Sequence, residues 1–591
     1  MRALLLALWA STAAHSSPSA AASSLERSRA PPSSRRLPQA PLARARAAER
    51  ARTALAASTG DGPVPCCPPF GPPAPPQFPA TYEQRFFTQP VTHFNYLQPT
   101  DANNATSTFE QQFLWHDKYW AGPPAPIVFY TGAEGAGVEY IWPHSGWVVD
   151  TLAKNLSALV VFAEHRFFGL SNPGGTPGGF FPDATHLGLL SEAEVLEDYT
   201  SLATAIRTNY SAWDSPLISV GGSLAGELTT WWRIRHPFMV DMGIASSAPI
   251  LGYFGIADPF GWNRVVMEAF RGVGGDECVN NMRSGYAATA ALAPADVTSA
   301  FNTCTPATLP CHGQQVAGLV MDWAGGAAES SYPPNANGSA VIKVCSAMSG
   351  TGGGVAAFKQ ALAPLVPGQC LNITWDWECP TDSRPSRDDD TDDSHFSPDP
   401  AFWGYCLSHL DEASTCVDGW SYQACTTEIH PISANNVTDF FPPETVDDRL
   451  NDCRFWYGGN LSLDFLAMPR SYGQLDLARM AASTSRLIFS SGSYDPWSAQ
   501  SVNASLSATL PVVVIDQGAH HSDLGGPMNP VPNPASDTPS LVAARQFEVD
   551  TLNEWVAAFH AERRAAKAFV ARREVAATAG RRGFDSDAIV S

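Results

Sequence analysis

Three short stretches carry residues that together could perform nucleophilic catalysis. ISVGGSLAGELTTWW (218–232) holds Ser223, SSGSYDPWS holds Asp495, and VVVIDQGAHHSDLGG holds His520 and His521. A serine hydroxyl is a poor nucleophile at neutral pH. It needs an imidazole to take its proton and a carboxylate to orient that imidazole. The three stretches supply one of each group.

The surroundings of Ser223 favour a serine held on a sharp turn. A β-rich run ends in two glycines before the serine, and a plausible helix follows it. The G-x-S-x-G pattern needs small residues because strand and helix backbones approach closely there. Ala225 stands at the last position, where a small residue can still fit, and Gly226 is next. The alternative is a glycine-rich turn without a catalytic role.

The chain order of the candidate residues is that of an α/β hydrolase: serine, then acid, then histidine. Asp495 lies just past one predicted strand end, and His520 lies in the loop after the following strand. The alternatives are a turn-forming aspartate before proline, and histidines in a surface loop or in a metal site with Asp523. The residues alone do not choose between His520 and His521.

The elements that must position these residues alternate between strand and helix, which predicts a parallel sheet covered by helices. In the predicted helix 191–210, Ser191 and Glu194 form a capping box, and apolar residues recur every three or four positions. A second long amphipathic helix is predicted over 540–564. The predicted strands are 126–132, 158–163, 217–220, 242–245, 486–492 and 511–516.

The fold class expected is α/β: an α/β-hydrolase core interrupted by a largely helical, disulfide-rich cap insertion. The predicted parts are a signal peptide (1–22), a Pro/Ala/Arg-rich pro-segment or linker (23–80), the first part of the core (81–251), the cap (252–470), the second part of the core (471–570) and a disordered tail (571–591).

Charge and hydropathy restrict the compartment and the partners. Residues 1–56 hold nine arginines and two glutamates, a net +7, and the whole chain carries −21, so the remainder carries −28. Such an acidic body argues against nucleic-acid binding. Arg2 and the apolar run 3–14 are typical of a signal peptide, and no window is long and apolar enough to span a bilayer.

Ten of the twelve cysteines lie between Cys278 and Cys453. No CxxC pair occurs, which argues against zinc, and an even number behind a signal peptide predicts disulfides within that region. Eight N-x-S/T sequons agree with a secretory route, at Asn104, Asn155, Asn209, Asn337, Asn372, Asn436, Asn460 and Asn503.

Several motifs together resemble the prolyl carboxypeptidase family of serine peptidases over about residues 82–562. They are FFTQPVTHFNY, PIVFYTGAEG, VVFAEHRFFGLS, GGSLAGE, WSYQACTTE, YDPWS and GAHHSDL, in this order. The resemblance implies that Ser223 is the nucleophile, although Leu224 and Ala225 depart from the family's G-G-S-Y-G-G motif. It also implies Asp495 as the acid, and His520, the first histidine of A-H-H, as the base.

An oxyanion hole needs two N–H donors. The N–H after the nucleophile belongs to Leu224. We expect the second in the loop after the strand ending at Tyr130, with Gly132 as the candidate donor. Glu134 in the same loop is expected either to have a structural role or to face the site.

The resemblance implies a serine exopeptidase that cleaves after proline near a peptide terminus, as a dipeptidyl-peptidase or a Pro-X carboxypeptidase. The chemistry needs no metal or organic cofactor. Expected substrates are short or terminal proline-containing peptides, a homodimer is a candidate assembly, and the location is secreted or lysosome/vacuole-like. The alternatives are an esterase or lipase, or a catalytically silent binding protein. Aromatic candidates for the pocket walls are Trp142, Trp147, Trp420 and Trp497, and the alternative for each is a place in the core.

Overall fold

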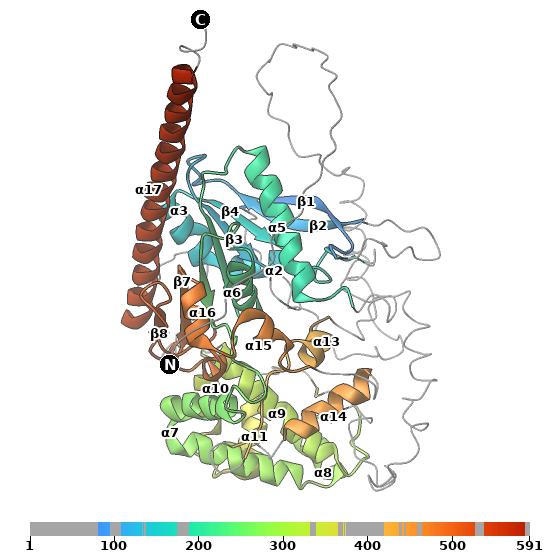
Figure 1. Ribbon diagram of the computed structural model, residues 1–591. Helices are drawn as coiled ribbons and strands as arrows, with labels where there is room; N and C mark the ends of the chain where they lie inside the picture. The colour runs from blue at the N-terminus through green and yellow to red at the C-terminus, as the bar shows by residue number, and fades with distance from the viewer. Residues whose placement is uncertain are drawn as a thin grey trace, which may run out of the picture. The chain divides into compact units, whose positions relative to one another are not determined.

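An eight-stranded sheet in the order β1-β2-β4-β3-β5-β6-β7-β8 is the centre of the computed structural model (Figure 1). Predictions for residues 1–80 lie outside the described residues. The structure describes residues 81–94, 108–132, 134, 137–173, 188–330, 339–363, 370–371, 373, 419–435, 440–441, 445–457, 464–525 and 537–584.

The six predicted strands form the parallel part of the sheet, while β1 and β2 were missed. β1 pairs antiparallel with β2, and β2 pairs antiparallel with β4. β3 to β7 are buried throughout, as expected for strands covered on both faces. The strands are β1 Glu83–Pro90, β2 Thr108–His116, β3 Ile127–Thr131, β4 Leu159–Ala163, β5 Leu217–Gly222, β6 Met242–Ser246, β7 Leu487–Gly492 and β8 Val512–Ile515.

Helix α5 begins where the sequence predicts. The Ser191 side chain caps it by accepting a hydrogen bond from the Glu194 N–H at 3.5 Å, and its apolar face is buried. Most of the helices that surround the sheet lie within the two core parts of the chain (Figure 1). These elements are α2 Val138–Ile141, η1 Trp142–His144, η2 Trp147–Leu152, α3 Ala153–Leu156, α5 Glu192–Asn209, α6 Leu224–Arg235, α16 Leu477–Ser483, η4 Pro496–Gln500 and α17 Pro539–Phe584.

The insertion between β6 and β7 is helical, as predicted. The helices between residues 261 and 362 pack around a hydrophobic cluster of their own, which includes Phe270, Val316 and Phe358. A second apolar centre therefore stabilises this part of the chain independently of the sheet. The helices are α7 Gly261–Ala290, α8 Pro294–Phe301, α9 His312–Glu329, α10 Ala340–Met348, α11 Gly354–Leu362, α13 Gly419–Thr426, α14 Val446–Tyr457 and α15 Ala467–Tyr472.

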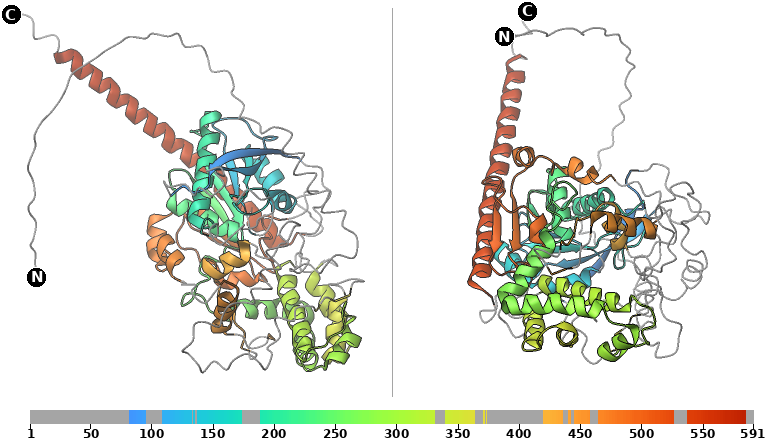
Figure 2. Two further views of the ribbon diagram at one scale, coloured as in Figure 1. Left: turned by 90° about the vertical axis from the view of Figure 1, so that its right-hand side faces the viewer. Right: turned by 90° about the horizontal axis from the view of Figure 1, so that it is seen from below.

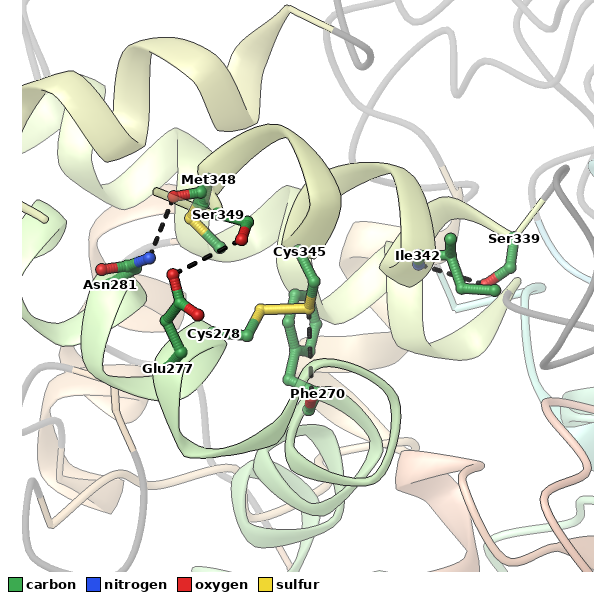
Figure 3. The surroundings of a disulfide bond; sticks show 9 residues. All are labelled: Phe270, Glu277, Cys278, Asn281, Ser339, Ile342, Cys345, Met348 and Ser349. Atoms are coloured by element: carbon green, nitrogen blue, oxygen red, sulfur yellow. Dashed lines mark hydrogen bonds between the residues drawn. A yellow bond between two sulfur atoms is a disulfide. The ribbon is translucent and has the colours of Figure 1, made fainter. Parts of the chain in front are cut away.

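Disulfides join the helices of the insertion, again as predicted. Cys278 of α7 bonds to Cys345 of α10, and the Asn281 amide donates to the Met348 carbonyl beside the bridge (Figure 3). The other two described bridges are Cys304–Cys370 and Cys425–Cys453.

We expect the double variant Cys278→Ala/Cys345→Ala to lose about 2–4 kcal/mol of unfolding free energy, because the bridge closes a long loop in the unfolded chain. The two cysteines are 67 residues apart in the sequence. Urea unfolding followed by tryptophan fluorescence measures the change. A midpoint equal to that of the wild type would show that the bridge does not constrain this unit.

The structure decides two expectations, one about the C-terminal tail and one about two tryptophans. The tail was expected to be disordered from residue 571, but α17 continues to Phe584 as one long helix (Figure 2). Of the two roles considered for Trp142 and Trp147, the structure favours the core, because they are 2% and 1% exposed and belong to the cluster beside the sheet. No helix in the described ranges is long and apolar enough to cross a membrane.

Candidate active site

Ser223 lies on the sharp turn between β5 and α6 and has backbone angles φ 59° and ψ −131°. An L-residue rarely adopts positive φ, so the surrounding structure must hold this strained conformation. The Ser223 N–H donates to the Ser246 carbonyl at 3.0 Å, and its carbonyl accepts from Gly226 at 2.8 Å. The turn thus raises the serine at the carboxyl end of the parallel sheet.

The two glycines before Ser223 are required by close backbone approach. A Cβ on Gly221 would lie 2.2 Å from the Ala225 carbonyl oxygen, and one on Gly222 would lie 2.9 Å from the His521 side chain. The Thr131 hydroxyl donates to that Ala225 carbonyl at 2.6 Å, and Ala225 is fully buried. The alanine that departs from the usual pattern is therefore accommodated in the turn.

Asp495 lies between β7 and the short helix η4, which begins at Pro496. Its Oδ1 atom accepts the Trp497 N–H at 3.0 Å and also lies 2.9 Å from Nδ1 of His520. The side chain is completely buried, and its Oδ2 atom has no hydrogen-bond partner among the described residues. The hydrogen bond from the Trp497 N–H therefore holds the Asp495 carboxylate in contact with the histidine.

His520 follows β8 and is tied to both the core and the insertion. Its Nδ1 contacts Asp495, and its main-chain N–H donates to the Glu329 carbonyl of α9 at 3.0 Å. A carboxylate at Nδ1 selects the tautomer in which Nε2 is the basic atom. Such a ring can take a proton from a hydroxyl.

His521 has a different environment from that of its neighbour. Its main-chain N–H donates to the Ser247 hydroxyl at 2.8 Å, and its side chain packs against Gly222. Burial and the neighbouring His520 lower the pKa of His521 to about 3, so the ring stays neutral. A group with so low a pKa is a weak general base at neutral pH.

Glu134 connects the serine to the histidine. The Ser223 side chain and the charge of His520 both lower the pKa of its carboxyl. Burial raises the pKa of Glu134 above its ordinary value, while the Glu134 backbone N–H, the charge of His520 and the Ser223 side chain oppose that rise. Of the two roles considered for Glu134, the structure favours the one facing the site.

Glu329, which was not predicted from the sequence, is a second acid beside His520. Its Oε1 accepts the Trp497 indole N–H at 2.7 Å. Burial acts to lower the pKa of His520, but the Asp495 charge and hydrogen bond, with Glu329 and Glu134, raise the pKa overall. The insertion therefore contributes to the electrostatics of the histidine.

We expect Glu329→Gln to move the rise of kcat/KM with pH toward lower pH. His520 accepts a proton only when it is neutral, which is the case above its pKa. Removing a carboxylate that raises that pKa lets the neutral form appear at lower pH. The pH profile of kcat/KM in the wild type and the variant measures this change. Glu548→Gln, which removes another buried acid, is the control, and identical profiles for Glu329→Gln and wild type would contradict the assignment.

The N–H groups of the two predicted oxyanion donors, Leu224 and Gly132, lie in different hydrogen-bonding environments. Leu224 is the first residue of α6, so its N–H is one of the four at a helix start that have no partner within the helix. The Gly132 N–H donates to the Tyr199 hydroxyl at 3.0 Å. This donor is therefore already engaged, and we do not retain Gly132 in the oxyanion hole.

The parallel sheet, the strained serine after β5, and an aspartate and a histidine after later strands define a hydrolase of the α/β class. The family model of serine carboxypeptidase S28 matches residues 97–548. The chain belongs to the serine carboxypeptidase S28 family and is a serine peptidase, which confirms the resemblance found in the sequence.

Curated relatives match most of the chain. Human lysosomal Pro-X carboxypeptidase is 29% identical over 514 residues, covering 83% of this chain and 92% of that protein. The prolyl carboxy peptidase like protein 5 of Caenorhabditis elegans is 26% identical and covers 80% of this chain and 90% of its own. Mouse thymus-specific serine protease is 27% identical, with 78% and 86% covered.

Proposed function

We propose that this serine peptidase is an exopeptidase that cleaves after proline near a peptide terminus, using Ser223, His520 and Asp495 as a catalytic triad. The observation that carries the proposal is the 2.9 Å contact between His520 Nδ1 and the buried Asp495 carboxylate, together with the strained turn that holds Ser223.

The proposed reaction follows from these positions. The Ser223 oxygen attacks the carbonyl carbon of the scissile bond. His520 Nε2 takes the hydroxyl proton, and Asp495 stabilises the resulting imidazolium. The Leu224 N–H donates to the oxyanion.

Collapse of the tetrahedral species breaks the C–N bond, and His520 returns the proton to the leaving nitrogen. An acyl-enzyme ester on Ser223 remains. Water then attacks this ester with His520 again as base, and releases the acid product and the free serine. No atom in this sequence has to come from a cofactor.

Two features favour different peptide ends. The names of the human and nematode relatives favour the carboxyl terminus of the substrate. Glu134 and Glu329 favour an amino terminus, because ionised carboxylates beside His520 would attract a substrate ammonium group. Blocked X-Pro-Phe is cleaved only in the first case, and X-Pro-amide with a free amine only in the second. Assaying both at pH 5 and pH 7 separates them.

We expect kcat/KM to fall at least about tenfold when proline before the scissile bond is replaced by alanine, because each lost methylene in a fitted apolar pocket costs roughly 1–3 kcal/mol. It should fall further for leucine or phenylalanine, which a compact pocket excludes. A matched peptide series varying only this residue measures the effect. Preference for phenylalanine, leucine or arginine would refute post-proline specificity while leaving the triad intact.

The location that we propose is the secretory pathway or a lysosome-like compartment. The disulfides of the insertion require an oxidising environment during folding. The human relative carries the word lysosomal in its name. The expected homodimer stays a prediction.

A further inference from the structure

A second group of ionisable residues is buried close to the nucleophile turn. Glu227 is in the first turn of α6, and its N–H donates to the Ser223 carbonyl at 3.1 Å. Glu428 and His430 follow α13. One ligand atom from each of the three residues can be chosen so that all lie within 4.8 Å of one another.

The two carboxyl groups of this cluster lack partners that would stabilise their charge. Glu227 and Glu428 are 1% and 0% exposed, and none of their four carboxylate oxygens has a hydrogen-bond donor in the described part of the chain. No lysine or arginine among the described residues forms an ion pair with them; their recorded ion-pair partner is His430. Two adjacent buried carboxylates need either a shared proton or a cation.

The orientation of His430 favours a cation. Its Nδ1 lies 3.0 Å from the Gly252 carbonyl, which can only accept, so Nδ1 carries the proton. In the neutral ring, Nε2 then presents its lone pair to Glu227 at 3.9 Å and to Glu428 at 3.7 Å. A histidine anchored through one nitrogen on a carbonyl is typical of metal ligands.

The spacing of these atoms suits a small ion. Ligand atoms about 2.1 Å from a tetrahedral ion lie roughly 3.4 Å apart. The Nε2–oxygen distances of 3.7 and 3.9 Å need to shorten by only a few tenths of an ångström. An outer group supports the site: Thr427 donates to Glu192 at 2.6 Å, and Glu192 in turn interacts with the Glu428 carboxyl.

We propose that Glu227, Glu428 and His430 form a structural binding site for a divalent transition-metal ion, for which zinc is the best match. One imidazole and two carboxylates are nitrogen and oxygen donors that suit zinc, while calcium prefers six to eight oxygens. The sequence gives no motif for this site, because Glu227 is far along the chain from the other two ligands.

The ion would join the nucleophile helix to the segment after α13. The site is also linked to the acid of the triad through Trp497. The His430 and Trp497 ring centroids lie 5.1 Å apart, and the Trp497 N–H donates to Asp495. Its role is to stabilise these elements, and the peptidase reaction has no step that uses it.

The test is metal retention and thermal stability of the full chain at pH 7.5. The protein is treated with a chelator, desalted and incubated with zinc chloride. After removal of excess metal, its zinc content is measured by inductively coupled plasma mass spectrometry. We expect about one tightly held zinc per chain, and a melting temperature several degrees above that of the chelated protein. Glu227→Gln and Glu428→Gln, which preserve side-chain size, should lose both effects.

Glu548→Gln is the matched control. Glu548 is also fully buried, with unpartnered carboxylate oxygens and a pKa raised by burial, but no histidine lies in its cluster. This variant should retain the zinc and the thermal shift. The proposal is overturned if chelation, zinc and manganese leave wild-type melting unchanged, or if Glu227→Gln keeps the zinc. If Glu227→Gln melts at a higher temperature than the wild type at pH 7.5 and holds as much zinc as the wild type, the two carboxyl groups share a proton instead of binding a metal.

Discussion

Ser223→Ala lowers kcat by roughly 10⁴- to 10⁶-fold in a folded protein, if Ser223 is the nucleophile. Without the hydroxyl no acyl-enzyme forms, and only the contributions of the oxyanion hole and substrate binding remain. Alanine keeps the Cβ atom, and Ser223 already holds its Cβ at φ 59°. The turn should therefore keep its conformation. Steady-state turnover of a proline-containing peptide measures the loss.

Thermal unfolding is the control for this variant. A melting temperature close to that of the wild type establishes that the loss of activity is chemical. Turnover within about tenfold of wild type in such a folded variant would remove Ser223 from the mechanism.

His520→Ala should be as inactive as Ser223→Ala, and the double variant should be little worse than either. Serine and histidine act as one unit, so the second substitution removes an interaction that the first has already removed. The contact of His520 with Asp495 at 2.9 Å is the structural reason to choose this histidine. Kinetics of the two single variants and the double variant measure the coupling.

His521→Ala is the matched control for this second prediction. His521 packs against Gly222, so its removal should disturb the turn and lower activity moderately. If His521→Ala were inactive while His520→Ala kept its activity, the base would be assigned to the wrong neighbour. Multiplicative losses in Ser223→Ala/His520→Ala would show that the two residues act independently.

Local patterns in the sequence predicted the parallel sheet and the positions of the candidate residues. Parallel strands β3 to β8 were recognisable as short apolar runs, and β3 to β7 are buried throughout. The two glycines before Ser223 pointed to a tight turn, and the structure shows the close contacts that require them. Asp495 and His520 could be placed because triad members follow strand ends in this fold.

The remaining features depend on contacts between distant segments. β1 pairs antiparallel with β2, and neither strand has a long apolar run that would mark it in the sequence. Glu329 reaches His520 only because the insertion packs on the core. The Gly132 N–H is engaged by Tyr199, which lies on helix α5, far along the chain from the loop of Gly132. Glu227 and His430 are likewise far apart in the sequence and come together only in the folded protein.

Some corrections concern residues whose local pattern has two meanings. Trp142 and Trp147 are large apolar residues that suit either a pocket wall or a core, and tertiary packing places them in the core. The polar sequence after residue 570 looked disordered, but it continues the amphipathic helix that packs beside β8. Alanine, arginine and glutamate are strong helix formers, which explains the extension.

Covalent labelling with a fluorophosphonate tests most directly whether Ser223 is an activated nucleophile. The reagent phosphonylates a hydroxyl that a neighbouring base deprotonates, so we predict one adduct, on the peptide containing Ser223, identified by tandem mass spectrometry. Labelling should disappear in Ser223→Ala and be strongly reduced in His520→Ala. Absence of an adduct in the folded wild-type protein, or an adduct on a different serine, would contradict the account.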